Sequence, residues 1–232
     1  MAIAFDAFAE TSSIGIPTAI TLTVGSIANG VILVGVIAED PNTPYALIDA
    51  VTATGLTFTE ILEQAFNPAG TEQLLSIWEA PSGSTSGNVD ITIDPSVGAD
   101  YGIVFACSFA NVDQADRLAG TPDDDTYTSG TTYTGSITTD TDNAMLVDFI
   151  NHQAGSAVLT KHADQTEIAQ LNQGTNVVGA CSYKLVGAAG VMSMEWTSDT
   201  AGTRVVHGKL ALKPSDVVAG TLLPRAMKMG IG

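Results

Sequence analysis

The chain has 232 residues and 45% of them are apolar, enough to bury the core of one large domain or two small ones, which excludes a disordered or fibrous chain. It carries 25 Asp and Glu against 8 Lys and Arg, a formal net charge of −17. Phosphate backbones and anionic lipid head groups repel a chain this acidic, so neither nucleic acid nor a membrane surface is an expected partner.

The N-terminal segment gives no sign of export. Residues 1–10 lack a basic region, and Asp6 interrupts their apolar run, so no cleaved secretory signal is expected and the protein should fold in a cytoplasm. The longest apolar run, Val31 to Ala38, is far shorter than the roughly 20 residues that cross a bilayer. Cys107 and Cys181 have neither zinc-site nor redox-pair spacing. We expect two reduced core thiols, or a disulfide if their strands are neighbours.

Alternation of apolar and polar residues predicts half-buried strands at residues 17–24 and 88–94. Both faces of Tyr101 to Ala110 are apolar, which predicts a central strand. In residues 191–197 the alternation places Trp196 with Met192 and Met194, which favours a core position over a sugar-stacking one. In residues 205–213 it places His207 and Lys209 on a solvated face, opposite Val206, Leu210 and Leu212.

Turn clusters separate further short strands, and helical periodicity is almost absent. The best helix candidate, Thr59 to Phe66, is one or two turns at most, and Ala163 to Leu171 is ambiguous. About a dozen strands in a Thr- and Gly-rich chain predict an all-β fold, an antiparallel β-sandwich or jelly roll. The other predicted strands are 3–8, 31–39, 47–53, 57–62, 73–79, 133–139, 144–152, 167–171 and 177–185.

Charge is distributed unevenly along the sequence. Up to Ile150 there are 20 acidic residues and one basic residue, Arg117, whereas from Asn151 onward there are five acidic and seven basic residues. Either two domains differ in charge, or one sandwich has an acidic face and a near-neutral face. Because no linker separates the halves, we predict a single β-sandwich domain over residues 1–214. Residues 113–130 would be a long loop or the crossover between sheets.

The pattern changes after Pro214. Ser215 to Gly232, SDVVAGTLLPRAMKMGIG, has no sustained period and combines apolar side chains with two cations. We expect an extended C-terminal arm over residues 215–232 that binds a neighbouring subunit or partner; the alternative is a tail that packs on its own domain. The partner-binding candidates are Leu222, Leu223, Arg225, Met227, Lys228 and Met229.

No catalytic, cofactor or metal signature stands out. The turn Gly83 to Gly87 has Thr where a nucleophile elbow needs Ser, and His152 and His162 match no standard metal spacing. The Asp-rich stretches 123–125 and 140–143 could offer oxygens to calcium but lack the helical calcium loop pattern, so solvated turns are expected. With 25 acids, a pair of carboxylates across a cleft is expected by chance and singles out no hydrolase. We therefore predict no enzyme and no cofactor.

The order of strands and turns in several segments carries a resemblance to known proteins. The segments are Trp78-Glu79-Ala80-Pro81 with the Ser/Gly turn after it, Asn88 to Ile93, Tyr101 to Phe109 with Asn111-Val112-Asp113, Met192 to Thr197, and Val205 to Pro214. Together they resemble β-sandwich virion proteins of tailed bacteriophages, over roughly residues 19–214. The resemblance implies a structural protein of the particle, either a capsid decoration (cement) protein or a head-fibre or tail component, with no catalytic residues to transfer.

The resemblance leads to definite expectations about partners. The major capsid protein or another virion protein would be the partner, on the capsid surface of a particle assembled in the host cytoplasm. We expect a homo-oligomer, with a trimer favoured. The competing hypotheses are a carbohydrate- or receptor-binding module with Thr/Asn-rich loops and a hydrolase on a jelly roll.

Overall fold

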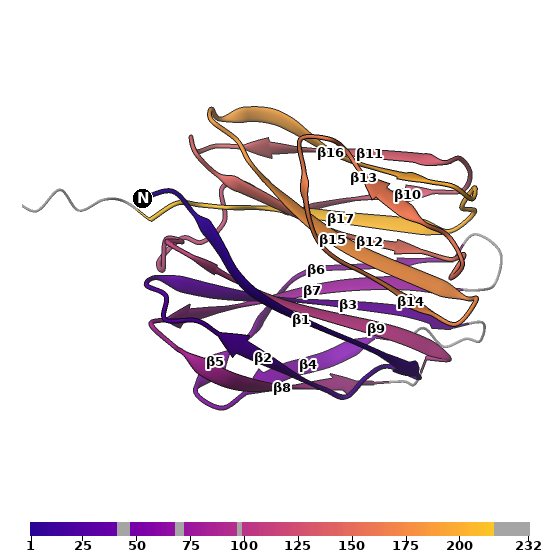
Figure 1. Cartoon of the computed structure of the whole chain (residues 1–232), viewed down its shortest axis with the longest axis horizontal. Helices are drawn as coiled ribbons and strands as arrows, with labels where there is room; N and C mark the ends of the chain where they lie inside the picture. The colour runs from indigo at the N-terminus through magenta and orange to yellow at the C-terminus, as the bar shows by residue number, and fades with distance from the viewer. Residues whose placement is uncertain (41–46, 68–71, 97–98, 216–232) are drawn as a thin grey trace, which may run out of the picture.

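The computed structural model describes residues 1–40, 47–67, 72–96 and 99–215. These residues form four antiparallel β-sheets stacked in layers, with no helix among them (Figure 1). The predicted all-β, sandwich-type fold is confirmed. The described part of the chain contains no helix that could cross a membrane.

The first two layers form a jelly roll from β1 to β9. The strands of the first inner sheet lie in the order β1-β9-β3-β7-β6, and those of the first outer sheet in the order β2-β8-β4-β5. The chain passes back and forth between the sheets, which is the winding of a jelly roll. The bounds are β1 Ala4–Ile14, β2 Ala19–Val24, β3 Gly30–Asp40, β4 Ile48–Ala53, β5 Leu56–Thr57, β6 Thr59–Phe66, β7 Glu72–Gly83, β8 Gly87–Pro95 and β9 Tyr101–Ala110.

The other two layers repeat this winding. The second inner sheet has the order β10-β17-β12-β15-β14 and the second outer sheet the order β11-β16-β13. Matching β10 with β1 and continuing along the chain reproduces the order of the first roll, with β5 alone lacking a counterpart among the described strands. The bounds are β10 Asp123–Tyr127, β11 Thr132–Thr139, β12 Met145–His152, β13 Leu159–Lys161, β14 Thr166–Gln173, β15 Val177–Leu185, β16 Gly190–Ser198 and β17 Val205–Leu212.

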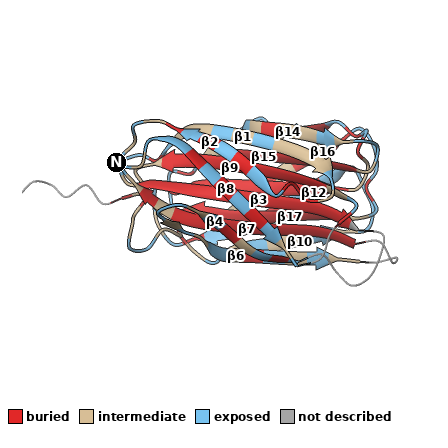
Figure 2. Ribbon diagram, turned by 90° about the horizontal axis from the view of Figure 1, so that it is seen from below, coloured by how far each residue is buried: buried red, intermediate tan, exposed pale blue. Residues whose placement is uncertain are grey.

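The two rolls pack through their inner sheets. Phe105, Phe109 and Phe149 lie in the apolar core between these sheets, which also contains Leu33 and Leu210. A second core fills the first roll, and two smaller clusters fill the second. Because each inner sheet is covered on both faces, its central strands are buried throughout, as Figure 2 shows in red.

The structure confirms several of the predicted strands and corrects the predicted helix. The alternation of β2 and β8 and the prediction of β9 as a central strand are confirmed, with β9 lying between β1 and β3. The helix candidate at 59–66 is wrong: Thr59–Phe66 is β6, an edge strand paired with β7. The ambiguous segment 163–171 contributes to β14.

The structure describes the predicted domain and only the first residue of the predicted C-terminal arm. Both rolls share a core, and the prediction that residues 1–214 behave as one domain stays a prediction. Ser215, the first residue of the predicted arm, is buried, and its amide donates to the carbonyl of Asn111 at 2.8 Å. The six partner-binding candidates, Leu222, Leu223, Arg225, Met227, Lys228 and Met229, lie outside the described residues.

Candidate functional site

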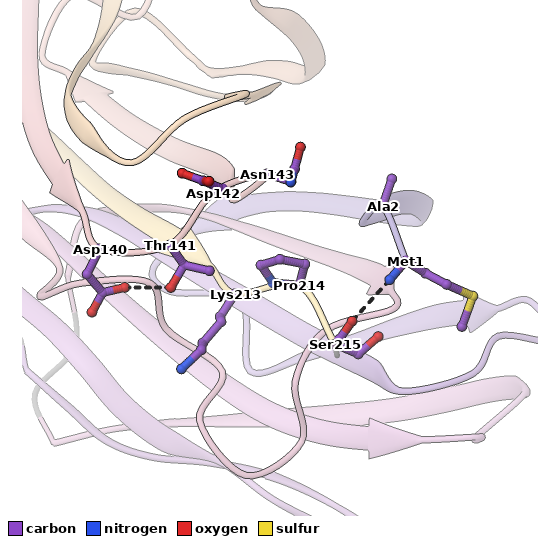
Figure 3. Close-up of a pocket in the computed structure, with 9 residues that line it drawn as sticks. All are labelled: Met1, Ala2, Asp140, Thr141, Asp142, Asn143, Lys213, Pro214 and Ser215. Atoms are coloured by element: carbon purple, nitrogen blue, oxygen red, sulfur yellow. Dashed lines mark hydrogen bonds between the residues drawn. The ribbon is translucent and has the colours of Figure 1, made fainter. Parts of the chain in front are cut away.

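The two ends of the described chain meet beside a hollow of about 710 Å³ (Figure 3). The ammonium of Met1 donates to the carbonyl of Ser215 at 3.0 Å. The turn Asp140–Asn143, between β11 and β12, forms another wall. Asn143 closes this turn with a positive φ of 59°, a conformation that Asn tolerates better than most residues. The hollow is therefore built from both ends of the described chain and one β-turn, around Ala2, Lys213 and Pro214.

Hydrogen bonds hold the acidic turn in place. The hydroxyl of Thr141 donates to Asp140 at 2.8 Å, and Asp142 accepts the amide of Ala189 at 2.8 Å. A neighbouring hollow of about 500 Å³ shares Asp140 and includes Asp123. Asp140 and Asp142 therefore line a concave surface at this end of the molecule.

The cations that line the larger hollow are already engaged. The Met1 ammonium binds Ser215, and Lys213 Nζ pairs with Asp116 Oδ2 at 2.6 Å, a contact that raises the pKa of Lys213. Asp113 accepts the amides of Ala115 and Asp116, and these bonds lower its pKa. The surface therefore offers carboxylates to a ligand, and it suits a cationic or hydrogen-bond-donating group better than an anion.

Asp148, in β12, lies at the centre of a buried cluster of hydrogen-bonded polar side chains inside the second roll. Its carboxylate accepts the amide of Ser182 at 3.0 Å, the Ser182 hydroxyl at 2.6 Å, Trp196 Nε1 at 2.9 Å and a bond with His207 Nε2 at 2.9 Å. All four residues are fully buried. The prediction that Trp196 lies in the core is confirmed, whereas the prediction that His207 is solvated is wrong. β17 is a central strand of the second inner sheet, and the second outer sheet covers this face.

Lys209 was also predicted on a solvated face, and this prediction is wrong as well. Its side chain is fully buried, and its Nζ pairs with Asp125 Oδ2 at 2.6 Å. The Asp123-Asp124-Asp125 stretch, expected as a turn, is the edge strand β10 paired with β17. Burial raises the pKa of Asp124, and the adjacent carboxylates act in the same direction. These acids therefore supply the counter-ion for a buried lysine.

The Asp148 group contains Ser, His and Asp but lacks the geometry of a nucleophilic triad. Ser182 donates to Asp148 and not to His207, whereas a triad needs the base on the nucleophile. The sequence signal that could have revealed this group is a lone Asp in the otherwise apolar segment Met145–Ile150. Its arrangement ties β12, β15, β16 and β17 together and gives it a structural role.

The two remaining histidines differ in exposure to solvent. The buried His152 is bonded to the Tyr133 hydroxyl at 3.1 Å, and burial lowers its pKa. His162 is exposed and pairs with Asp164, which also binds Lys184. Over the described ranges, no group of three or more His, Cys, Asp or Glu side chains is placed to hold a metal ion.

Cys107 and Cys181 are both free and fully buried in the core between the rolls. They lie on β9 and β15, which belong to different inner sheets. Burial raises the pKa of both thiols. The expectation of reduced core thiols is confirmed.

Comparisons with known proteins add little to this geometry. No protein family matches the sequence, and no curated protein matches it. Among solved structures, the C-terminal domain of the AgI/II polypeptide BspA of Streptococcus agalactiae aligns with a TM-score of 0.17 and 10% identity, over 90% of this chain and 92% of that one. A similarity this low carries no argument about fold or function.

Proposed function

We propose that the protein is a non-enzymatic structural component of a virus particle, a capsid decoration protein on the outer surface of a tailed-phage head. The observation that carries the proposal is the jelly-roll winding, present twice in one chain. Viral capsid and lectin domains use this winding, and the resemblance of the strand and turn order to phage virion proteins selects between them. One fold hosts many unrelated functions, so the test must come from the particle.

The distribution of charge supports the proposal. In the described part of the chain, Arg117, Lys184, Arg204, Lys209 and Lys213 are paired with carboxylates, and Lys161 Nζ donates to the carbonyl of His162. The outward charge is therefore strongly negative, which keeps such a protein soluble and away from the packaged nucleic acid. The major capsid protein would be its partner, and symmetric shells bind many copies, so that modest contacts suffice.

The test is the copy number of this chain in purified particles of its source, measured by quantitative mass spectrometry against the most abundant shell protein. We expect copies in the hundreds, as a homo-oligomer distributed over the capsid surface. A few copies to a few tens would assign the chain to a fibre, vertex or tail position. Absence from particles would overturn the proposal, and a glycan array would then test the lectin use of the same winding.

A further inference from the structure

The inner sheets of the two rolls meet as the subunits of a twofold-symmetric dimer do. Strand order matches β1, β3, β6, β7 and β9 with β10, β12, β14, β15 and β17. β1 contacts β14 and β6 contacts β10; β7 contacts β17 and β9 contacts β15. Reciprocal contacts of this kind define an isologous interface. β3 contacts its own counterpart β12, so the pseudo-twofold axis passes between these two strands.

A residue and its own counterpart meet at this axis. Asn29 and Asn143 precede β3 and β12 with positive φ angles of 50° and 59°. Counting six residues from each reaches Gly35 and Phe149, which are therefore counterparts. A Cβ on Gly35 would overlap the ring of Phe149. Two identical residues cannot fill this position, because two rings would collide and two glycines would leave a void.

The same complementarity recurs away from the axis. By strand register, Phe105 and Gly208 are counterparts, and so are Leu75 and Gly179. A Cβ on Gly179 would lie 2.9 Å from the ring of Phe105, and one on Gly208 would lie 2.8 Å from the side chain of Leu75. These two contacts are exchanged by the pseudo-twofold axis. In both, a glycine of the second roll receives a large side chain of the first.

Pairing either roll with its own copy would lose this fit. Two first rolls would set Phe105 against Leu75, and two second rolls would set Phe149 against Phe149, and both arrangements overpack the interface. The polar contacts between the rolls are also one-sided. The Asn151 side chain of the second roll donates to the carbonyls of Ala38 at 3.2 Å and Leu74 at 2.8 Å in the first roll, whereas its counterpart Ile37 has no side-chain donor.

Charge also opposes pairing between two first rolls. Residues 1–112 contain 12 acidic residues and no Lys, Arg or His. In the intact chain, Arg204 of the second roll lies 3.5 Å from Glu39 of the first. Two first rolls would leave the buried Glu39 side chain without that arginine.

We infer that the inner face of each jelly roll is a recognition surface for the other roll and rejects a second copy of itself. The single chain then consists of two unlike jelly rolls that pair as the subunits of a heterodimer do, joined by residues 113–122. This inference does not depend on the proposed virion function.

One test separates the rolls without altering either inner face. A protease site is inserted between Thr121 and Pro122, which lie outside every strand, and the folded full-length chain is cleaved. The cleaved protein is unfolded in guanidinium chloride, refolded and examined by native mass spectrometry. We expect the 1:1 complex to exceed each homodimer at least about tenfold, because one overpacked contact costs about that factor. Homodimers in comparable amount, or fragments that stay apart, would overturn the inference.

A second test uses the intact chain. Gly35→Phe and Phe149→Gly are made singly and together, because counterparts at a pseudo-twofold axis should be exchangeable. We expect each single variant to lower the urea midpoint and the double variant to exceed both. Gly187→Leu is the control, since a Cβ at Gly187 meets no atom within 4 Å. A double variant whose urea midpoint does not exceed those of both single variants would overturn the inference.

Discussion

Arg117 and Glu79 form a two-point ion pair between the connection of the two rolls and strand β7. Arg117 Nε and Nη2 donate to the two carboxylate oxygens of Glu79 at 2.8 and 2.6 Å. The Glu79 side chain is only 5% exposed, and the bond to it raises the pKa of Arg117. The connection is also bonded to Lys213, whose amide donates to the Arg117 carbonyl at 2.8 Å. Arg117 therefore links the first roll to the end of β17.

Removing this arginine should destabilise the whole protein. We expect Arg117→Ala to lower the free energy of unfolding by about 3 kcal/mol, because it leaves a buried carboxylate without its partner. Lys213→Ala breaks the more exposed pair with Asp116 and should cost much less than Arg117→Ala. Urea denaturation followed by circular dichroism measures both. Equal losses of unfolding free energy in the two variants would show that the Arg117–Glu79 pair stabilises the protein no more than the exposed pair does.

The buried carboxylate of Asp148 should be equally sensitive. Asp148→Asn keeps the volume but turns one acceptor into a donor that faces Ser182, Trp196 or His207, so we expect a loss of about 3 kcal/mol. Asp94→Asn, at an exposed position of β8, serves as the matched control and should change stability by less than about 0.5 kcal/mol. A tolerated Asp148→Asn would contradict the view that the four buried residues depend on both acceptor oxygens of Asp148.

Stability should fall as the pH rises through the titration of Glu39. Burial raises the pKa of Glu39 from 4.5 to about 7, with Arg204 acting in the opposite direction. The folded state therefore binds more protons than the unfolded state between these values, and stability decreases from about pH 4.5 to 7. Glu39→Gln should flatten this part of the curve of unfolding free energy against pH. An unchanged slope would exclude Glu39 as its source.

Thiol reactivity should report separation of the rolls. Cys107 and Cys181 are fully buried between the inner sheets, so we expect no reaction with a thiol reagent in the native state and two thiols per chain after unfolding. Arg117→Ala should accelerate labelling if its pair holds the rolls together. Rapid labelling of the native wild-type protein would contradict the buried placement.

The two rolls should unfold together. Since Phe105 and Phe149 belong to one core shared by both inner sheets, we expect a single calorimetric transition with equal calorimetric and van't Hoff enthalpies. This measurement tests the prediction of one domain over residues 1–214. Two separate transitions would instead divide the chain near residues 113–122.

Local sequence patterns correctly predicted strands that have one buried face and one face exposed to solvent. Alternation identified β2 and β8 because each has a buried face and a solvated face. The same rule failed for His207 and Lys209, whose polar side chains are covered by a second sheet and bonded to Asp148 and Asp125. Period alone could not predict this, because covering by a distant sheet is a tertiary relationship.

The repeat of the winding was also hidden from sequence reasoning. Counterparts such as Gly35 and Phe149 are unlike residues, since the contact between the rolls requires unlike side chains there. The signal that was available is Arg117, the single basic residue before Ile150, which proves to be the ion-pair partner of Glu79. An isolated cation in an acidic stretch indicated a specific contact, although it did not identify the partner.

The absence of Lys and Arg from residues 1–112 makes the first roll invisible to common chemical probes. Trypsin first cuts after Arg117, so nearly the whole first roll leaves as one large peptide that routine proteomics overlooks. Lysine-directed cross-linkers likewise find no lysine side chain in the first roll. A contact made through the first roll would leave no cross-link, so carboxylate-directed reagents and cleavage at acidic residues are needed to orient the protein on a surface.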